Sequence, residues 1–235
     1  MEKIDVLIWR RDGIDVPAIR RALTDEVGPG LLEDDSARIT ELVVHTADTD
    51  DAIPKPSLLM GRGAELSAVV TVWLDSIDDR ATVVDSIAAA TLTAPGDGLD
   101  AYLVTESVPQ RRTDRDWADG MISPGITHFT CFPQPTRLSD ADFYRGWHDI
   151  HTPASFRLHP LRWEYVRDSV VRPLTPIDRP LAAIVFERFR TIEDYTDPAR
   201  LYGGPETLTE TMEHLPLYAD YEDLDSRPLH EFILR

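Results

Sequence analysis

One helix-to-loop junction carries the residue types and spacing best suited to proton chemistry. Phe143 and Trp147 recur at helical spacing and predict a helix buried on one face, with His151 one turn further on. Because a residue before proline is biased away from helical geometry, Thr152-Pro153 predicts that this helix ends at about His151. A neutral imidazole there could act as a base near neutral pH. The alternative is a cap that binds the last carbonyls of the helix.

A second histidine lies inside a predicted strand. Alternation places His128, Thr130 and Phe132 on one side of that strand, and Phe129 and Cys131 on the other. His128 is therefore either a core residue with a satisfied ring or a pocket group that polarises a carbonyl or phenol of a substrate. Cys131, the single cysteine, fits a buried apolar position better than the role of nucleophile.

Aromatic residues around this junction predict a binding pocket. Tyrosine hydroxyls could donate hydrogen bonds to a substrate oxygen, although packing in the core or at the rim explains them as well. Glu164 is expected to share a strand face with Arg162, either as its ion-pair partner or as a pocket acid. The residues predicted to bind a substrate are Tyr144, Trp147, Trp163, Glu164 and Tyr165.

The patterns for metals and cofactors are incomplete. His148 and His151 lie three apart and could hold a metal with His128 or His159, but no further ligand stands at a diagnostic spacing. Gly61-Arg62-Gly63 lacks the lysine of a phosphate loop, and the sequence has no G-x-S-x-G nucleophile elbow. We therefore predict no metal and no cofactor.

Composition restricts the partners. The 235 residues include 24 basic and 42 acidic ones, a formal charge of −18 that repels phosphate backbones and anionic lipids. No segment approaches the roughly 20 apolar residues of a membrane span, and the first residues do not resemble a secretion signal. We expect a cytoplasmic protein that binds a small molecule and neither nucleic acid nor membrane.

The same order of elements occurs twice along the chain. Helices are predicted over 15–27, 77–90 and 139–151, from Thr191 onward and, as a short addition, over 205–214. Ser76, Ser139 and Thr191 each precede an aspartate by three residues, as in a capping box. β-branched and aromatic enrichment predicts strands over 4–10, 39–45, 67–74, 101–108, 126–132, 161–167, 181–188 and 229–234.

This order, strand-helix-strand-strand-helix-strand, is the ferredoxin-like unit, so we predict an α+β protein of two tandem ferredoxin-like repeats. The apolar run of 181–186 suits strands buried on both faces, as in repeats packed sheet to sheet. The predicted divisions are residues 1–108, a polar linker over 109–125, and 126–235. Long loops are expected at 46–63 and 197–227, where they could cover a site.

The second repeat resembles the EthD family. The resemblance rests on the aromatic pair Phe143 and Trp147, then His151-Thr152-Pro153, then a strand with aromatic residues at Trp163 and Tyr165. Thr152 departs from the family pattern, where a small apolar residue is usual. The resemblance implies the dimeric α+β barrel superfamily and a small-molecule cavity between a sheet and its helices. The chain is then a pseudo-dimer, either monomeric or further assembled.

At the matching place in the first repeat, Val27-Gly28-Pro29 holds no histidine, so we expect that repeat to be a degenerate scaffold and the chemistry to lie in residues 126–235. The leading hypothesis is a cofactor-independent acid/base enzyme acting on a hydrophobic, oxygenated, aromatic or polyketide-like molecule. In it His151 moves a proton and His128 or a tyrosine polarises oxygen. Cyclase, isomerase, dehydratase and oxygenase reactions all stay open. The alternatives are a non-catalytic binding protein and a haem-binding barrel with an axial histidine.

Overall fold

The computed structural model describes residues 1–9, 15–34, 38–49, 53, 66–178 and 180–235. Arg10, most of the long loop expected over 46–63, and Gly61-Arg62-Gly63 lie outside the described residues. No helix among the described residues is long and apolar enough to cross a membrane.

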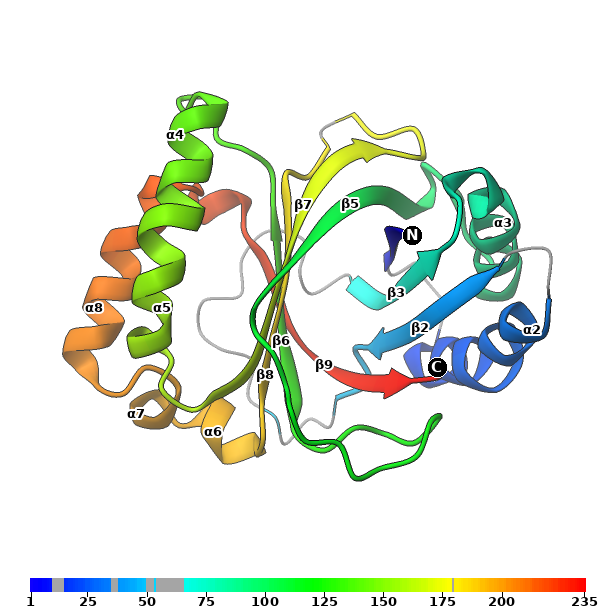
Figure 1. Cartoon of the computed structure of the whole chain (residues 1–235), viewed down its shortest axis with the longest axis horizontal. Helices are drawn as coiled ribbons and strands as arrows, with labels where there is room; N and C mark the ends of the chain where they lie inside the picture. Colours follow the sequence, from blue (N-terminus) through cyan, green and yellow to red (C-terminus); the bar gives the residue numbers. More distant parts are fainter. Residues whose placement is uncertain (10–14, 35–37, 50–52, 54–65, 179) are drawn as a thin grey trace.

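Eight antiparallel strands close into a barrel at the centre of the molecule (Figure 1). Around the barrel the order is β1-β3-β2-β9-β6-β8-β7-β5, and β5 pairs back onto β1. A two-residue strand, β4 (Ala94–Pro95), adds to β5. The barrel strands are β1 (Glu2–Trp9), β2 (Ile39–Thr46), β3 (Leu66–Leu74), β5 (Gly98–Gln110), β6 (Ile126–Phe132), β7 (Arg162–Pro173), β8 (Ala183–Phe189) and β9 (Asp225–Ile233).

Each half of the chain contributes four neighbouring strands in the same arrangement. Numbered within its half, each set runs fourth-first-third-second, which is the ferredoxin-like order. The halves join where β2 pairs with β9 and β5 pairs with β7. The predicted α+β fold class is confirmed, with the barrel built inside one chain.

The interior of the barrel is a shared apolar core. Leu7 and Val69 from the first half pack with Phe129, Cys131 and Phe186 from the second. Phe129 and Cys131 point inward from β6, as strand alternation predicted. A thiol in this position is a packing group.

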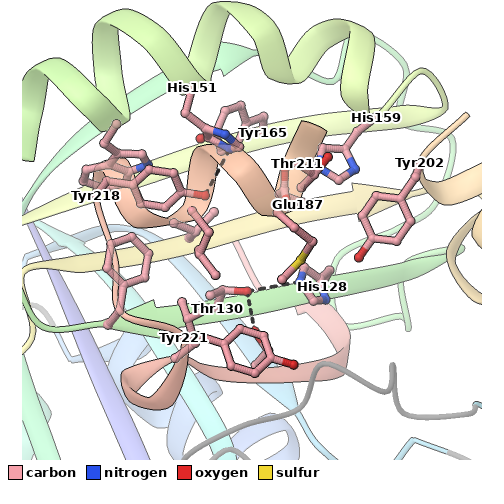
Figure 2. Close-up of a pocket in the computed structure, with 17 residues that line it drawn as sticks. His128, Thr130, His151, His159, Tyr165, Glu187, Tyr202, Thr211, Tyr218 and Tyr221 are labelled. Atoms are coloured by element: carbon pink, nitrogen blue, oxygen red, sulfur yellow. Dashed lines mark hydrogen bonds between the residues drawn. The ribbon is translucent and has the colours of Figure 1, made fainter. Parts of the chain in front are cut away.

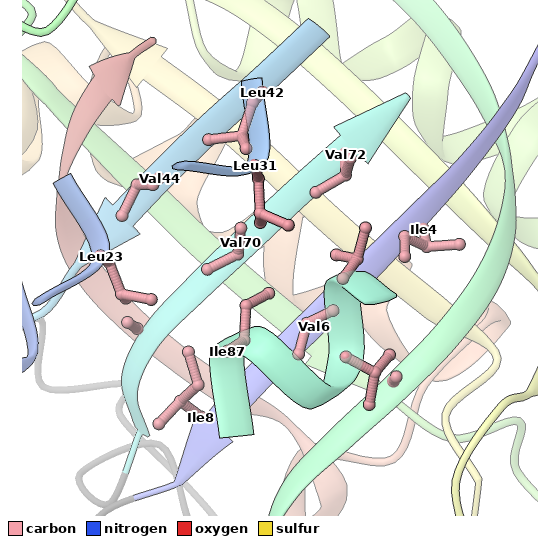
Figure 3. Packing of buried hydrophobic residues seen from close by; sticks show 14 of the residues in the cluster. Ile4, Val6, Ile8, Leu23, Leu31, Leu42, Val44, Val70, Val72 and Ile87 are labelled. Atoms are coloured by element: carbon pink, nitrogen blue, oxygen red, sulfur yellow. The ribbon is translucent and has the colours of Figure 1, made fainter. Parts of the chain in front are cut away.

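Helices of the first half cover one outer face of the barrel (Figure 1). They comprise α1 (Val16–Arg21), a π-helical segment (Ala22–Val27), α2 (Gly28–Glu33) and, after β3, α3 (Arg80–Thr91). Ile4, Val6 and Ile8 point outward from β1 into a cluster of aliphatic side chains beneath these helices (Figure 3). These three residues are fully buried, so this layer is a conventional core.

Helices of the second half cover the opposite face. They are α4 (Asp140–Tyr144), a π-helical segment (Arg145–His151) and α5 (Thr152–Leu158), followed after β8 by α6 (Ile192–Thr196), α7 (Pro198–Leu201) and α8 (Pro205–His214). The short helix expected over 205–214 is present. The helix expected from Thr191 onward is broken into α6 and α7.

The prediction that a helix ends at His151 is wrong, because the helix continues to Leu158 through a wider turn. The amide of Thr152 donates to the carbonyl of Trp147, five residues back, and its hydroxyl donates to the same oxygen at 2.9 Å. Pro153 lacks an amide hydrogen and crowds the preceding turn, and the π-helical turn relieves that conflict. His151 therefore lies within a long helix instead of at its end.

Two of the three predicted caps form as expected. The hydroxyls of Ser139 and Thr191 accept from the amides of Asp142 and Asp194, at 3.2 and 3.1 Å. Ser76 accepts instead from Asp78, because a short 3-10 turn (Ile77–Asp79) precedes α3.

Candidate functional site

A cavity of about 120 Å³ lies between the outer face of the second half's sheet and its helices (Figure 2). Strands β6, β7 and β8 form its floor, the helix of His151 forms one wall, and the segment after α7 closes it. The lining is aromatic and apolar with a few polar groups: His128, Thr130, Phe132, Trp147, His151, His159, Tyr165, Val185, Glu187, Tyr202, Thr211, Met212, Leu215, Tyr218, Tyr221, Leu224 and Ser226.

His128 is held at the floor by hydroxyl groups. Its Nδ1 lies 3.2 Å from the hydroxyl of Tyr195, and its Nε2 lies 3.1 Å from Thr130. Thr130 in turn contacts Ser226 at 2.9 Å. Burial lowers the pKa of His128 to about 4, a shift that the nearby Glu187 carboxylate opposes. The ring is therefore neutral at pH 7, and both of its nitrogens already have partners.

His151 presents a different environment on the opposite wall. The side chain is only 7% exposed, in contrast to the accessible helix end expected from the sequence. Its Nε2 lies 3.4 Å from the hydroxyl of Tyr218, and Nδ1 has no partner among the described residues. Burial lowers the pKa of His151 to about 3. The imidazole is neutral at pH 7 and retains an unused nitrogen.

Glu187 is the one acidic residue of the lining. Burial alone would raise its pKa, but Arg162 and the neighbouring histidines outweigh burial and lower the pKa to about 2. Arg162 donates to this carboxylate and to Ser155 at 3.0 Å, and its guanidinium lies 4.1 Å from the centre of the Tyr165 ring. Glu187 is thus a fixed negative charge that favours the protonated form of any histidine facing it.

His159 is a second histidine with an orientation suited to accepting a proton. Its Nδ1 lies 3.1 Å from the carbonyl oxygen of Leu201, so in the neutral ring Nδ1 carries the hydrogen. Nε2 is then the acceptor. Burial lowers the pKa of His159, so this ring is also neutral at pH 7. From its sequence pattern, His159 was expected only as a candidate metal ligand.

The long segment expected over 197–227 covers the cavity. It supplies three lining tyrosines, Tyr202, Tyr218 and Tyr221, together with Met212 (Figure 2). Burial raises the pKa of Tyr202 to about 12 and that of Tyr218 well above its usual value, so both hydroxyls keep their hydrogens near neutral pH. The number of tyrosines in this segment was a sequence signal for its place in the cavity wall, but these tyrosines were not among the predicted site residues.

The predicted binding residues do not all lie together. Trp147 and Tyr165 line the cavity with His128 and His151. Tyr144 is 37% exposed on the outer side of its helix, against the ring of His148. Trp163 and Glu164 lie away from this cavity: Glu164 lines the mouth of the barrel, and the indole of Trp163 donates to Asp114.

An irregularity in β7 separates residues that were expected to share a face. The pairing of β7 with β8 shifts register between Arg162 and Glu164. Arg162 consequently points outward to Glu187, whereas Glu164 points inward to Arg112. Such a bulge adds a residue to one strand and reverses the alternation that the sequence analysis assumed.

No three histidine, cysteine, aspartate or glutamate side chains within the described ranges are grouped as metal ligands. His148, one of the candidates, is half-exposed and lies against the rings of Tyr144 and Trp147. His128 and His159 both line the cavity, but each is already bonded within the protein.

Comparisons with known proteins support the architecture. No protein-family model and no curated protein matches the sequence. Among solved structures, an anthrone oxidase-like protein is similar with a TM-score of 0.60 and 11% identity, over 99% of this chain and 93% of its own. A candidate monooxygenase from Fusobacterium nucleatum subsp. nucleatum is similar with a TM-score of 0.53 and 9% identity, over 100% and 92% of the two chains. At this level of identity the likeness concerns the fold.

Proposed function

We propose that this protein is a cofactor-independent enzyme that removes a proton from a small, apolar, oxygenated aromatic molecule and directs the resulting anion to molecular oxygen. The observation that carries the proposal is the cavity itself. Neutral imidazoles from opposite walls, His128 and His151, face an aromatic space with one fixed negative charge at its edge. Such a site accepts a proton from a carbon acid or phenol without a metal ligand set.

His151 is the proposed base because its Nδ1 has no partner among the described residues. Its lowered pKa makes it a weak base in the empty site. A substrate anion beside the ring, together with Glu187, stabilises the imidazolium as it forms. The hydroxyl of Tyr218 is placed to hydrogen-bond the oxygen on which charge develops. His128 would do so by exchanging its bond to Thr130 or Tyr195 for one to the substrate. Trp147 and Tyr165 orient the ring of the substrate.

Oxygenation is favoured over cyclisation, isomerisation and dehydration by the descriptions of the two similar structures, an anthrone oxidase-like protein and a candidate monooxygenase. In the proposed reaction the carbanion passes an electron to O₂, and the two radicals combine into a peroxide. Loss of water then leaves a carbonyl. One CH₂ group and one O₂ give one C=O group and one H₂O, and no further reductant is required.

The dimensions of the cavity restrict the substrate. A cavity of about 150 Å³ is known to hold benzene, so about 120 Å³ accommodates roughly one ring. A three-ring substrate requires the segment of Tyr202 and Tyr218 to move outward. The same dimension disfavours haem, whose macrocycle is several times larger than one ring.

The division of the chain into a site-bearing repeat, a scaffold repeat and a linker is part of this proposal. We assign residues 126–235 to an EthD-like, site-bearing repeat, residues 1–108 to a scaffold repeat without a site, and residues 109–125 to the linker. The order of Phe143, Trp147 and His151 along one helix supports the EthD-like assignment, since Trp147 and His151 line the same cavity.

The test separates proton transfer from oxygenation. Chelator-treated protein is incubated in D₂O without oxygen, with anthrone or with the one-ring carbon acid phenylacetone, and deuterium in the CH₂ group is measured by NMR. We expect enzyme-dependent exchange and, in air, one O₂ consumed for each carbonyl formed. Saturable binding without exchange would instead support the non-catalytic alternative.

A further inference from the structure

A second cavity occupies the open mouth of the barrel, on the inner face of the sheet. It measures about 650 Å³, within the range of small-molecule pockets. Along β8 the two cavities alternate: Glu187 faces the first, and its neighbours Phe186 and Arg188 face the second. Both halves of the chain line it, with Lys3, His45 and other residues from the first.

One wall of this mouth cavity is apolar and aromatic. The ring of His45 stacks on Phe186 with 4.7 Å between centres and 28° between planes. Trp73 forms part of the wall beside Val43 and Ile233. A planar ring of a ligand would find an apolar surface here.

Buried nitrogens on the wall lack partners. His45 is 4% exposed, and neither ring nitrogen makes a hydrogen bond to a described residue; Nε2 stands 3.5 Å from a carboxylate oxygen of Glu231. The Nε of Arg188 is likewise buried and unpartnered. Among the described wall residues, the buried polar atoms without a partner are therefore all nitrogens. The Nε hydrogen of Arg188 and the single ring hydrogen of neutral His45 are donors, and leaving them unpaired costs free energy that a ligand with acceptor oxygens would recover.

Guanidinium groups add charge at the same place. Arg112 and Arg188 both approach one oxygen of Glu231, at 2.9 and 3.2 Å. Glu164 is a looser partner of Arg112, at 3.5 Å. Buried Arg188 and partly buried Arg112 thus share one close carboxylate. Because the terminal nitrogens of Arg188 also donate to Thr127 and Pro124, the donors open to an entering anion are its Nε and those of Arg112 that Glu231 leaves free.

We propose that the barrel mouth is a binding site for a small aromatic carboxylate, with its ring on Phe186 and Trp73 and its carboxylate directed to His45, Arg112 and Arg188. The site does not depend on the reaction proposed for the first cavity. It exists only because both halves of the barrel are present in one chain, since each contributes a part of the wall.

The experiment titrates the full chain with benzoate by isothermal calorimetry, with benzyl alcohol as the uncharged match. We expect saturable binding of benzoate and at least tenfold weaker binding of benzyl alcohol. Arg112→Gln should weaken benzoate binding by about tenfold or more, the loss expected for a charged hydrogen bond. Arg145→Gln is the matched control, because Arg145 is an exposed arginine paired with Asp142, and neither residue lines the mouth cavity. It should bind benzoate normally.

A second variant keeps the test decisive if Arg112→Gln does not fold. Val43→Trp fills the cavity from β2 without removing any charge, and it should abolish benzoate binding. His151→Ala should leave benzoate binding unchanged. Absence of benzoate binding at millimolar concentration, equal binding of benzyl alcohol, or loss of binding in His151→Ala but not in Val43→Trp would each overturn the proposal.

Discussion

The first helices of the two halves share an unusual backbone. In both, a π-helical segment ends just before an X-Pro pair, Gly28-Pro29 in the first half and Thr152-Pro153 in the second. In both, the amide before the proline donates to the carbonyl five residues back, from Gly28 to Leu23 and from Thr152 to Trp147. The helix passes the proline by the same widened turn in each half.

The side chains beneath these helices differ. On the first half's sheet, Ile4, Val6 and Ile8 fill the space with aliphatic groups, and Val27 packs against the same cluster. On the second half's sheet, His128 and the strand neighbours on its face line a cavity instead. His151 occupies the helical position of Val27. The comparison indicates that the backbone supplies a place for a site, and that substituting polar and aromatic side chains for aliphatic ones opens it.

The strongest test of this comparison separates the halves. Residues 1–108 expressed alone lose the partners of β2 and β5, and expose the inner face that carries Leu7, Val69 and Tyr102. We expect this fragment to aggregate or self-associate, because unpaired edges and apolar patches promote association. Size-exclusion chromatography and thermal unfolding measure the outcome. A monomer with a cooperative transition would show that the first half is an independent domain.

The next largest effect concerns the matched pair His151 and Val27. His151→Ala should lower turnover about 10²–10⁴-fold, the usual contribution of a general base. Its unfolding free energy should fall by only about 1–3 kcal/mol, since a single buried ring is lost. Val27→Ala should lower stability by about 1 kcal/mol and leave turnover intact. Activity is measured as deuterium exchange, and stability by urea unfolding.

If His151→Ala unfolds readily while its folded fraction stays fully active, His151 is a packing residue. His159→Ala would then be the next variant to measure, because the Nε2 of His159 is the other acceptor among the lining histidines.

A third prediction concerns a cluster of buried charged residues to which both halves contribute. Asp5 of β1 and Asp168 of β7 are fully buried beside Lys3, whose amine lies 2.7 Å from Asp168. Burial raises the pKa of both aspartates, and each carries one oxygen without a partner. A shared proton would satisfy both oxygens.

Because the folded state binds this proton more tightly than the unfolded chain, the contribution of this pair to stability should fall as pH rises from the ordinary aspartate pKa through the raised values. The buried neutral histidines His128 and His151 contribute the opposite slope at acidic pH, so the effect is read as the difference between wild type and Asp5→Asn. Asp5→Asn should remove this pH-dependent contribution to the unfolding free energy. Asp5→Ala would in addition leave a cavity in the core. The measurement is the unfolding free energy against pH. A difference in unfolding free energy between wild type and Asp5→Asn that stays constant with pH throughout this window would contradict the shared proton.

The smallest expected effect comes from a comparison of two helix-capping serines. Ser139 accepts from the amide three residues ahead, whereas Ser76 accepts from the amide two ahead. Ser139→Ala should lower the unfolding free energy by about 0.5–2 kcal/mol, the usual cost of losing a cap. Ser76→Ala should cost less, because its bond belongs to a short 3-10 turn. Equal losses in thermal unfolding would show that the two caps are equivalent.

The sequence predicted the strands and their order well, because alternation and β-branched enrichment report directly on burial. It also placed His128 on the side of β6 opposite Phe129 and Cys131, and two of its predicted binding residues, Trp147 and Tyr165, line the same cavity as His128. It failed at Glu164, since a bulge is invisible to alternation. It also failed at the end of the His151 helix, since local rules for proline omit the π-helical turn. Tyr218 was missed because it reaches the cavity from the long insertion, and His159, at the end of α5, was expected only as a metal ligand.

The position of β9 in the barrel has a consequence for how the protein is made. β9 is synthesised after the other seven barrel strands, yet it lies between β2 and β6, where Val43 pairs with Ile233. Until it is in place, β2 and β6 each retain an unpaired edge on the ribosome. Barrel closure therefore waits for contacts between the most distant parts of the chain, which slows folding and lengthens exposure to aggregation. A translational pause or truncation shortly before residue 225 should be far more harmful to solubility than one within the helices.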